Sequence, residues 1–468
     1  GRTLEAADCV AAPLDVLLLL PQLVSKSLVM RGVDAASESW PAEIPAPEPR
    51  YAYLETIRQY ARDRLIEAGA VEEARDRHFD YYETLSRTTQ FGANSANSVL
   101  QGDRLLIEQD NLRAAAEWSI DRYPQRTLDL IWNLTPFISD NLPGLEALNW
   151  LSAALQRLEE MPPAVGEEAE RRQRARFRGL VSTGMLQMFL GQLNDANANA
   201  SKTIDQLQQH DSDPLLLANA LFVKAQTGYF LEDPALEETI AQAEEVLRGM
   251  PDDPLKRLLL AMILMLAAET ASRKGNMEAV ERLYTESEAI VETSTNAFLA
   301  WLEYSRLLVI LQIDLETGLV RKQYEKVIGL LRQTRSSRVA AMAESDWAHR
   351  LRREGSTDEA MAIYRRMLVE WRELGHRAAM ANILENMAFI DRVEDRPERA
   401  VTLLGAAERI REAIGQDMLR PEREEYEREV AELKRSLDTE KLDELWSKGR
   451  NMPTDGVIDL ALHKESGS

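Results

Sequence analysis

The chain has 468 residues, enough for two or three domains, and 56 Lys and Arg against 78 Asp and Glu give a formal net charge of −22. A field of this sign repels a phosphate backbone, so direct nucleic-acid binding is not expected. Cys9 is the only cysteine, which excludes an intrachain disulfide and a cysteine zinc site and favours a reducing, cytoplasmic compartment.

The N-terminal part, residues 1–66, has the pattern of a small winged-helix-like unit. Its expected segments are two short helices (residues 4–10 and 14–24), two strands (27–30 and 50–54) and an amphipathic helix that ends at Gly69. A proline-rich stretch, residues 31–49, separates the strands and is expected to be a long exposed loop. The alternative is a helical hairpin with a disordered loop.

The next segment, residues 67–124, is expected to be a helical linker, with a break in the helical pattern near residues 92–98. Residues 128–158 then have the pattern of a degenerate first repeat, with Pro143 and Gly144 near its turn.

A pattern of small residues recurs every forty residues or so through the central part of the chain. Its cleanest copy is Trp347, Ala348, Leu351, Gly355, Ala360 and Tyr364. The turn positions of four copies are Gly191, Gly275, Gly355 and Asp395, so the gaps are 84, 80 and 40 residues. We therefore expect one weaker repeat within each of the first two gaps. The order of large, small, turn and aromatic residues is that of the tetratricopeptide repeat, or TPR.

Close packing explains this pattern. Each repeat is expected to be a pair of antiparallel helices that cross where both side chains are small, such as Ala348 and Ala360. A single pair cannot bury both faces, so stacked pairs form a continuous core and a superhelix with a concave side. We therefore predict an all-α, TPR-like superhelical solenoid over residues 125–440. The alternative is an irregular helical bundle.

The C-terminal part contains a charged helix over residues 421–437, followed by a short closing segment within residues 441–468. Val457, Ile458, Ala461 and Leu462 give the last piece an apolar stripe, and Thr454 is expected to cap it.

Several short stretches of the sequence resemble one known family. They are Thr3–Ala7, Leu23–Val29, Arg50–Ala61, Glu108–Ala115, Leu403–Glu408 and the run from Trp446 through Leu462. Together they resemble the region that follows the nucleotide-binding domain in bacterial STAND-type regulators, with LETIRQYA within Arg50–Ala61 as the most specific piece. These regulators are signal-transducing ATPases that often carry LuxR-like or SARP-like DNA-binding domains.

The resemblance implies that this chain is a C-terminal fragment, that its ATPase domain lies upstream in the same polypeptide, and that the first helix of the winged-helix unit is missing. Two features depart from the family. The proline-rich loop is longer than expected, and no helix-turn-helix follows residue 462.

Motifs for chemistry are absent from the sequence. It contains no GxxxxGK[ST] phosphate loop, no GxSxG, no HExxH and no CxxC. No two of the five histidines are three or four residues apart, so no helical metal pair is expected. No apolar run reaches membrane-spanning length. We expect no catalysis, no cofactor and no metal in this chain.

The concave face of the superhelix is the expected functional surface. Counting from the small residue of each first helix places these candidates on it: Arg178, Met185, Met265, Glu269, His349, Arg352, Glu385, Phe389 and Arg392. Flexible methionines suit adaptable binding surfaces, although at helical spacing they can equally fill a core. Arg352 and Arg392 occupy equivalent positions one repeat apart, so they could hold an anionic group together or simply neutralise nearby acids.

The function we expect is a sensor and interaction module of a STAND-type transcriptional regulator. It would bind a small-molecule inducer or a protein partner and relay that state to the ATPase domain. Two alternatives remain at this point, a constitutive scaffold for protein assembly and a helical enzyme of unrecognised type. A sizeable closed pocket would favour the sensor, an open groove the scaffold, and a buried cluster of titratable groups the enzyme.

Overall fold

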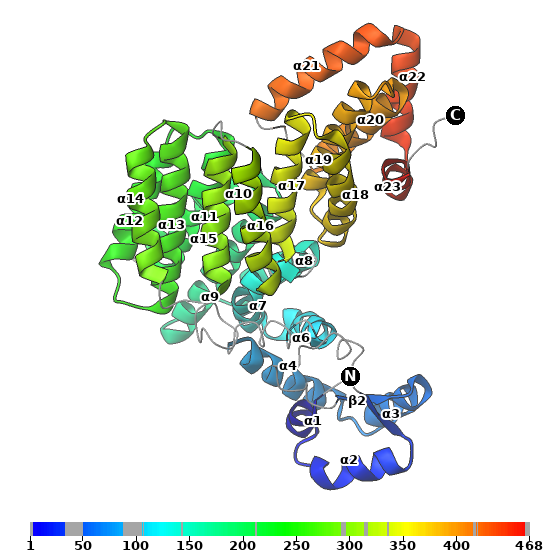
Figure 1. Cartoon of the computed structure of the whole chain (residues 1–468). Coiled ribbons are helices and arrows are strands. Elements are labelled where there is room, and N and C mark those ends of the chain that lie inside the picture. Colours follow the sequence, from blue (N-terminus) through cyan, green and yellow to red (C-terminus); the bar gives the residue numbers. More distant parts are fainter. Residues whose placement is uncertain are drawn as a thin grey trace.

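The computed structural model describes residues 3–32, 50–87, 105, 107–141, 144–210, 213–291, 296–312, 317–334, 337–414, 418 and 420–463. Helices dominate these residues, and two short strands complete the fold (Figure 1). Among these residues no single helix is long and apolar enough to cross a membrane. The pair α1 and α2 meets that test only together, and it is bent by 115°.

The N-terminal module has the expected order of elements. Helices α1 (Leu4–Ala11) and α2 (Val16–Ser25) precede the strands β1 (Val29–Gly32) and β2 (Arg50–Tyr53), and α3 (Glu55–Glu67) follows. The strands pair antiparallel with Val29 opposite Tyr53. The proline-rich loop lies outside the described residues except for its first two positions, so its conformation stays a prediction.

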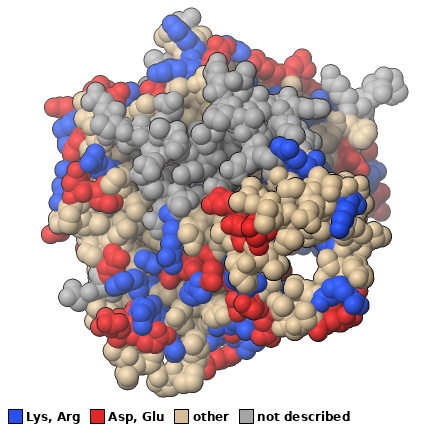
Figure 2. Space-filling model, turned by 90° about the horizontal axis from the view of Figure 1, so that it is seen from below, with Lys and Arg blue, Asp and Glu red and all other residues tan. Residues whose placement is uncertain are grey.

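Apolar side chains on this module are unusually exposed. Leu14, Leu17 and Leu18 around the start of α2 are 59–65% exposed, and the expected apolar face of α3 contains no buried residue. Figure 2 views the molecule from the side of this module, where uncharged residues gather on the right. The helix was therefore predicted correctly, but in the described part of the chain nothing buries its apolar face.

A buried ion pair fastens the module to the helices that follow, α4 (Val71–Arg87) and α6 (Gln109–Arg122). Arg50 at the start of β2 donates to Glu108 over 2.5 Å, and Tyr82 donates to the other oxygen of that carboxylate over 2.7 Å. Arg50 and Glu108 belong to two of the segments that carry the family resemblance. The contact therefore brings these two distant segments together in the folded chain.

The next two helices, α7 (Pro124–Asn141) and α8 (Gly144–Glu160), form the degenerate first pair. They share one hydrophobic core with α4 and α6, in which Phe79, Leu112, Leu128 and Leu151 are buried. The expected helical linker and the first repeat are thus packed together. The predicted four-part division of the chain itself stays a prediction.

In the described residues, six helix pairs form the predicted superhelix. The pairs are α9 (Glu167–Phe189) with α10 (Leu193–Gln209), α11 (Pro214–Leu231) with α12 (Leu236–Gly249), α13 (Pro254–Arg273) with α14 (Met277–Val291), α15 (Asn296–Gln312) with α16 (Thr317–Gln333), α17 (Ser337–Arg353) with α18 (Thr357–Glu373), and α19 (Arg377–Val393) with α20 (Pro397–Ile414). The all-α, TPR-like solenoid is confirmed, and both weaker repeats are present as the second and fourth pairs.

The turns within these pairs have the backbone conformation that the sequence indicated. Gly191, Gly275 and Gly355 have φ of 77°, 72° and 85°, a region that side chains other than glycine rarely adopt. Asp395 takes the same place in the last pair with φ of 60°. Aspartate is one of the few other residues that tolerate this conformation, because its short polar side chain can bond locally.

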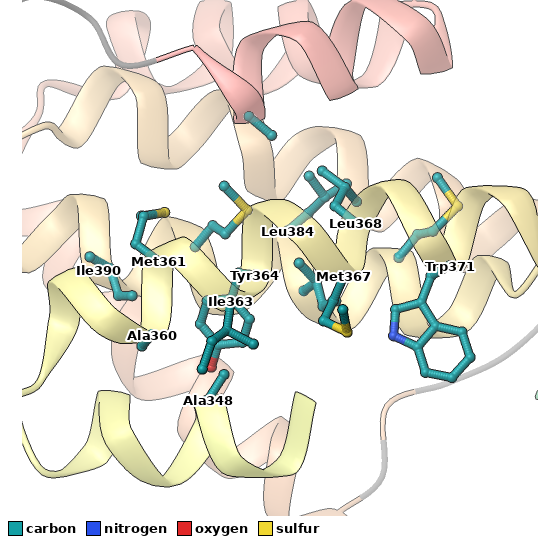
Figure 3. Close-up of a cluster of buried hydrophobic side chains, with 14 of the residues drawn as sticks. Ala348, Ala360, Met361, Ile363, Tyr364, Met367, Leu368, Trp371, Leu384 and Ile390 are labelled. Carbon is teal, nitrogen blue, oxygen red and sulfur yellow. The ribbon is translucent and has the colours of Figure 1, made fainter. Parts of the chain in front are cut away.

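The small residues lie where the paired helices approach each other. Ala348 on α17 and Ala360 on α18 are both fully buried, and Figure 3 shows them in the space between the two helices. Large side chains, among them Tyr364 and Trp371, fill the core around this crossing.

Ala348→Leu should therefore destabilise the chain. The added atoms must enter a crossing that is already filled, which costs on the order of 1–3 kcal/mol of unfolding free energy. Urea denaturation followed by circular dichroism measures the change. An unchanged midpoint would show that the repeat register is wrong at this pair.

In the part of the C-terminal region that the structure describes, three helices follow the superhelix: α21 (Arg420–Ser436), α22 (Thr439–Asn451) and α23 (Thr454–Leu462). Leu445, Val457 and Ile458 lie in the same hydrophobic core as α17–α20. The expected cap was wrong, because Thr454 is the first residue of α23 and the preceding Pro453 occupies the cap position without a side-chain hydrogen bond. Figure 1 shows α21 extending across the end of the superhelix, away from α22.

Candidate functional site

The first helices of the six pairs form the inner layer of the superhelix. α9, α11, α13, α15, α17 and α19 contact one another in succession, whereas each second helix packs mainly on the first helices beside it. The superhelix turns so far that α17 also contacts α7. At this closure the guanidinium of Arg338 on α17 lies 4.2 Å from the ring centre of Phe189 on α9.

The N-terminal candidates are engaged within this layer. Arg178 pairs with Asp129 of α7 over 2.7 Å. Met265 is buried in the hydrophobic core and Met185 packs against it partly buried. Both methionines therefore fill the core, which is the alternative that the sequence left open.

Glu269 lies in a buried polar cluster between α13, α14 and α15. Ser305 donates a hydrogen bond of 2.5 Å to its carboxylate, and the hydroxyl of Tyr284 lies 2.8 Å from the Ser305 oxygen. Burial raises the pKa of Glu269 to about 7.

A second, partly buried carboxylate belongs to the same region. Tyr304 on α15 donates to Asp346 on α17 over 2.8 Å, and burial raises the pKa of Asp346 to about 6. The sequence analysis missed Asp346 and its tyrosine partner. The signal was present as a polar pair, Ser345 and Asp346, directly before the repeat's Trp347.

Glu269→Gln should change how stability depends on pH. The carboxyl of Glu269 stays neutral in the folded chain up to about pH 7, but it ionises near its ordinary value of 4.5 in the unfolded chain. The free energy of unfolding therefore falls as pH rises between these values, by on the order of 3 kcal/mol. The variant lacks this loss and should be more stable than the parent chain at pH 8.

Urea denaturation of both proteins at pH 5 and pH 8 measures the difference. Asp346→Asn is the matched second variant. It should reduce the change in unfolding free energy between pH 5 and pH 8 as well, but by less than Glu269→Gln does. Identical pH profiles for the parent and Glu269→Gln would contradict the predicted neutral carboxyl.

The C-terminal candidates meet around α17 and α19. His349 Nδ1 lies 2.8 Å from the Tyr364 hydroxyl, and burial together with the nearby Arg352 lowers the pKa of His349 to about 3. Arg352 donates to the Asn386 side chain over 2.8 Å, and its guanidinium lies 5.3 Å from the ring centre of Phe389. His349 is thus a neutral, partly buried support for this surface.

Helix α21 covers both candidate arginines. Arg352 donates to Glu425 over 2.7 Å, and Arg392 donates to Glu429 over 2.5 Å. Phe389 faces Tyr426 with ring centres 6.5 Å apart. Each of the two guanidinium groups therefore binds a carboxylate of the chain itself. This arrangement matches the second role considered from the sequence, in which the arginines neutralise nearby acids.

Glu385 is part of a separate buried pair. Arg411 on α20 donates to both of its oxygens, over 2.7 and 2.8 Å, and only 3% of the surface of Glu385 is exposed. It therefore helps to hold α19 against α20, and in this conformation a ligand on the inner face cannot reach it.

A small cavity lies where the superhelix closes on itself. Its lining residues are Ile138, Gly144, Leu186, Phe189, Leu190, Arg338, Leu374 and His376. Its volume of about 10 Å³ admits roughly one water molecule, whereas small-molecule pockets are on the order of 300–1,000 Å³. Burial lowers the pKa of His376 to about 4. Within the described residues no three His, Cys, Asp or Glu side chains are grouped to hold a metal ion.

Comparisons with known proteins agree with the sequence landmarks. No protein-family model matches the chain. Over 325 residues, 66% of this chain, it is 27% identical to proteins of Mycobacterium bovis and Mycobacterium tuberculosis that are provisionally named HTH-type transcriptional regulators. The matched region is only 34% of the length of those relatives. The resemblance to bacterial transcriptional regulators is thereby confirmed.

Among solved structures, the chain is similar to a STAND protein with a tetratricopeptide repeat sensor from Pyrococcus horikoshii. The two are 15% identical with a TM-score of 0.35, and the similarity covers 96% of this chain and 63% of that one. A score this low carries no weight for the fold, which is established by the helix pairs described above.

Proposed function

We propose that this chain is a non-catalytic regulatory module of a bacterial transcriptional regulator and that it binds a partner protein on the inner face of α17 and α19. The sequence similarity over 325 residues supports the regulatory role. The single observation that carries the binding site is the surface made by Arg352, Phe389 and Arg392, which is already engaged by an acidic helix.

A protein partner fits this surface better than a small-molecule inducer does. The cavity at the closure has room for about one water molecule, and the three residues line up along two successive helices rather than around a pocket. The carboxylates of Glu269 and Asp346 do not line that cavity, so we propose no catalytic role for them. A constitutive scaffold remains the second candidate, since the same surface could hold a partner permanently.

In the full regulator, the N-terminal module would connect this surface to an ATPase domain in the same polypeptide. The buried pair of Arg50 and Glu108 supports that role, because it joins the module to the helices on which the superhelix is built. Paired and buried charges of this kind resist displacement of either partner.

A two-hybrid screen of a genomic library from the source organism tests the proposal. Partners recovered with the parent chain should be lost with the double variant Arg352→Ala, Arg392→Ala. The matched control is Arg248→Ala with Arg321→Ala, two partly exposed arginines on the second helices α12 and α16, which should keep every partner. Partners that still bind the Arg352→Ala, Arg392→Ala variant but not the control variant would show that the binding site lies on the outer face.

The purified chain should not bind ATP. No phosphate-binding loop is present in the sequence, so the nucleotide lacks the backbone cradle and the lysine it requires. Isothermal titration calorimetry with Mg-ATP measures this. Saturable binding in the micromolar range would contradict the non-catalytic assignment and favour the enzyme.

A further inference from the structure

Helix α21 rests by one of its faces on the C-terminal ends of α17 and α19, where Arg352 and Arg392 lie. Of the helices it touches, α19 belongs to the inner layer and α20 to the outer one. Glu425, Tyr426 and Glu429 are the residues of α21 that meet the candidate surface, and Val430 and Leu433 beyond them are buried in the core. The opposite face of the helix, with Glu427 and Arg428, is exposed.

The charges on the two sides match in spacing. Glu425 and Glu429 are four residues apart, so they stand one above the other on consecutive turns of α21. Their partners Arg352 and Arg392 come from successive inner helices, forty residues apart in the sequence. The two guanidinium groups are therefore spaced so that two carboxylates one helical turn apart can bind both of them at once.

Neighbouring side chains of α19 hold the Arg352 guanidinium in position. Asn386 accepts a hydrogen bond from Arg352, and the guanidinium stacks near the Phe389 ring. Only 10% of the Arg352 side chain is exposed. A cation fixed in this way loses little freedom when a carboxylate binds, and the adjacent aromatic ring adds an apolar contact for a neighbouring side chain.

The attachment of α21 differs from that of the helices after it. Helix α22 crosses α20 so closely that a side chain at Gly405 or Gly449 would collide with backbone atoms. Arg399 separately holds the end of α23 through the carbonyls of Leu460 and Ala461. α21 instead meets this surface through side chains: two ion pairs, the contact of Tyr426 with Phe389, and Val430 and Leu433 in the core beyond them. A competing helix would have to replace these side-chain contacts, whereas α22 is held by the close backbone crossing with α20.

We propose that the surface of Arg352, Phe389 and Arg392 recognises an acidic amphipathic helix, with carboxylates at positions i and i+4 and an aromatic residue at i+1. Helix α21 is its internal occupant, and a partner helix of the same chemistry displaces it. The identity of the natural partner rests on the proposed function, but the recognition itself does not.

A peptide of residues 420–436 is the probe. It is labelled and titrated by fluorescence anisotropy into the full chain carrying Glu425→Gln, Tyr426→Ala and Glu429→Gln, which should vacate the surface. Saturable binding is expected, about tenfold or more tighter than to the parent chain, whose surface is occupied. Adding Arg352→Ala and Arg392→Ala should weaken it by about tenfold or more, and salt should weaken it too.

Two altered peptides serve as matched controls. The Glu425→Gln, Glu429→Gln peptide should lose binding. The Glu427→Gln peptide, changed on the exposed face, should bind like the parent peptide. Where the triple variant fails to fold by circular dichroism, the double variant Glu425→Gln, Glu429→Gln takes its place in the titration.

Three results would overturn the proposal: no binding to a folded vacated chain, binding that ignores both arginines, and equal binding to the parent and vacated chains. The two-hybrid screen is independent of this titration. Arginine-dependent partners without peptide binding would leave the proposed function standing and remove the acidic-helix inference alone.

Discussion

Gly449→Ala is expected to be among the most destabilising single substitutions in the chain. A Cβ at this position would lie 2.0 Å from the Thr402 carbonyl oxygen of α20, and one at Gly405 would lie 2.3 Å from the Trp446 carbonyl oxygen of α22. Both obstacles are backbone atoms, so the two helices would have to move apart. We expect a loss of at least about 3 kcal/mol of unfolding free energy, and a comparable loss for Gly405→Ala.

Gly329→Ala is the matched control, because Gly329 lies within α16 and a Cβ there meets nothing within 4 Å. That substitution should stabilise the chain slightly, by about 0.5–1 kcal/mol, since alanine favours the helix. Urea denaturation gives the free energies, and hydrogen exchange over residues 439–462 reports whether α22 and α23 detach. Equal midpoints for Gly449→Ala and the parent chain would refute the close crossing.

Asp391→Ala should produce the second large loss. Asp391 is fully buried, and Arg399 donates to both of its oxygens over 2.6 and 2.7 Å while Arg396 donates to one of them. Removing the carboxylate leaves the guanidinium of Arg399 buried without its counter-charge, which costs on the order of 3–5 kcal/mol. Denaturation midpoints of the single variant and the parent chain measure it.

The same substitution in an Arg399→Met background separates the ion pair from other effects. There the loss from Asp391→Ala should be much smaller, because the remaining partner Arg396 is partly exposed and also pairs with Glu394, so no buried cation is left unpaired. An equal loss in both backgrounds would mean that the cost comes from the cavity alone. This pair also matters for the chain end, since Arg399 binds the last carbonyls of α23.

The repeat pattern was sufficient to predict the helix pairs because packing constrains each position locally. Small residues such as Ala348 and Ala360 are required where helices cross, and glycine is favoured where the backbone turns with positive φ, so both leave a mark in the sequence. Asp391 shows the limit of this reading. It occupies a position where the preceding repeat has Leu351, and only its arginine partners, the buried Arg399 and the partly exposed Arg396, explain it.

The candidate site was predicted less well, because contacts between distant segments decide which of its residues are exposed and which are covered. The sequence placed Arg352, Phe389 and Arg392 on one surface, but it gave no sign that α21, some seventy residues after Arg352, would cover them. The sequence also placed Met265 and Glu385 on this surface, but in the folded chain both side chains are buried in the interior.

By itself, then, the sequence determined the all-helical repeat, its turns and its likeness to transcriptional regulators, because these depend on residue types at short, regular spacings. The tertiary structure alone decided which charged groups are buried, which helix covers Arg352 and Arg392 and how closely α22 crosses α20. Those features arise where segments far apart in the chain meet, and the identity of a residue does not specify its distant neighbours.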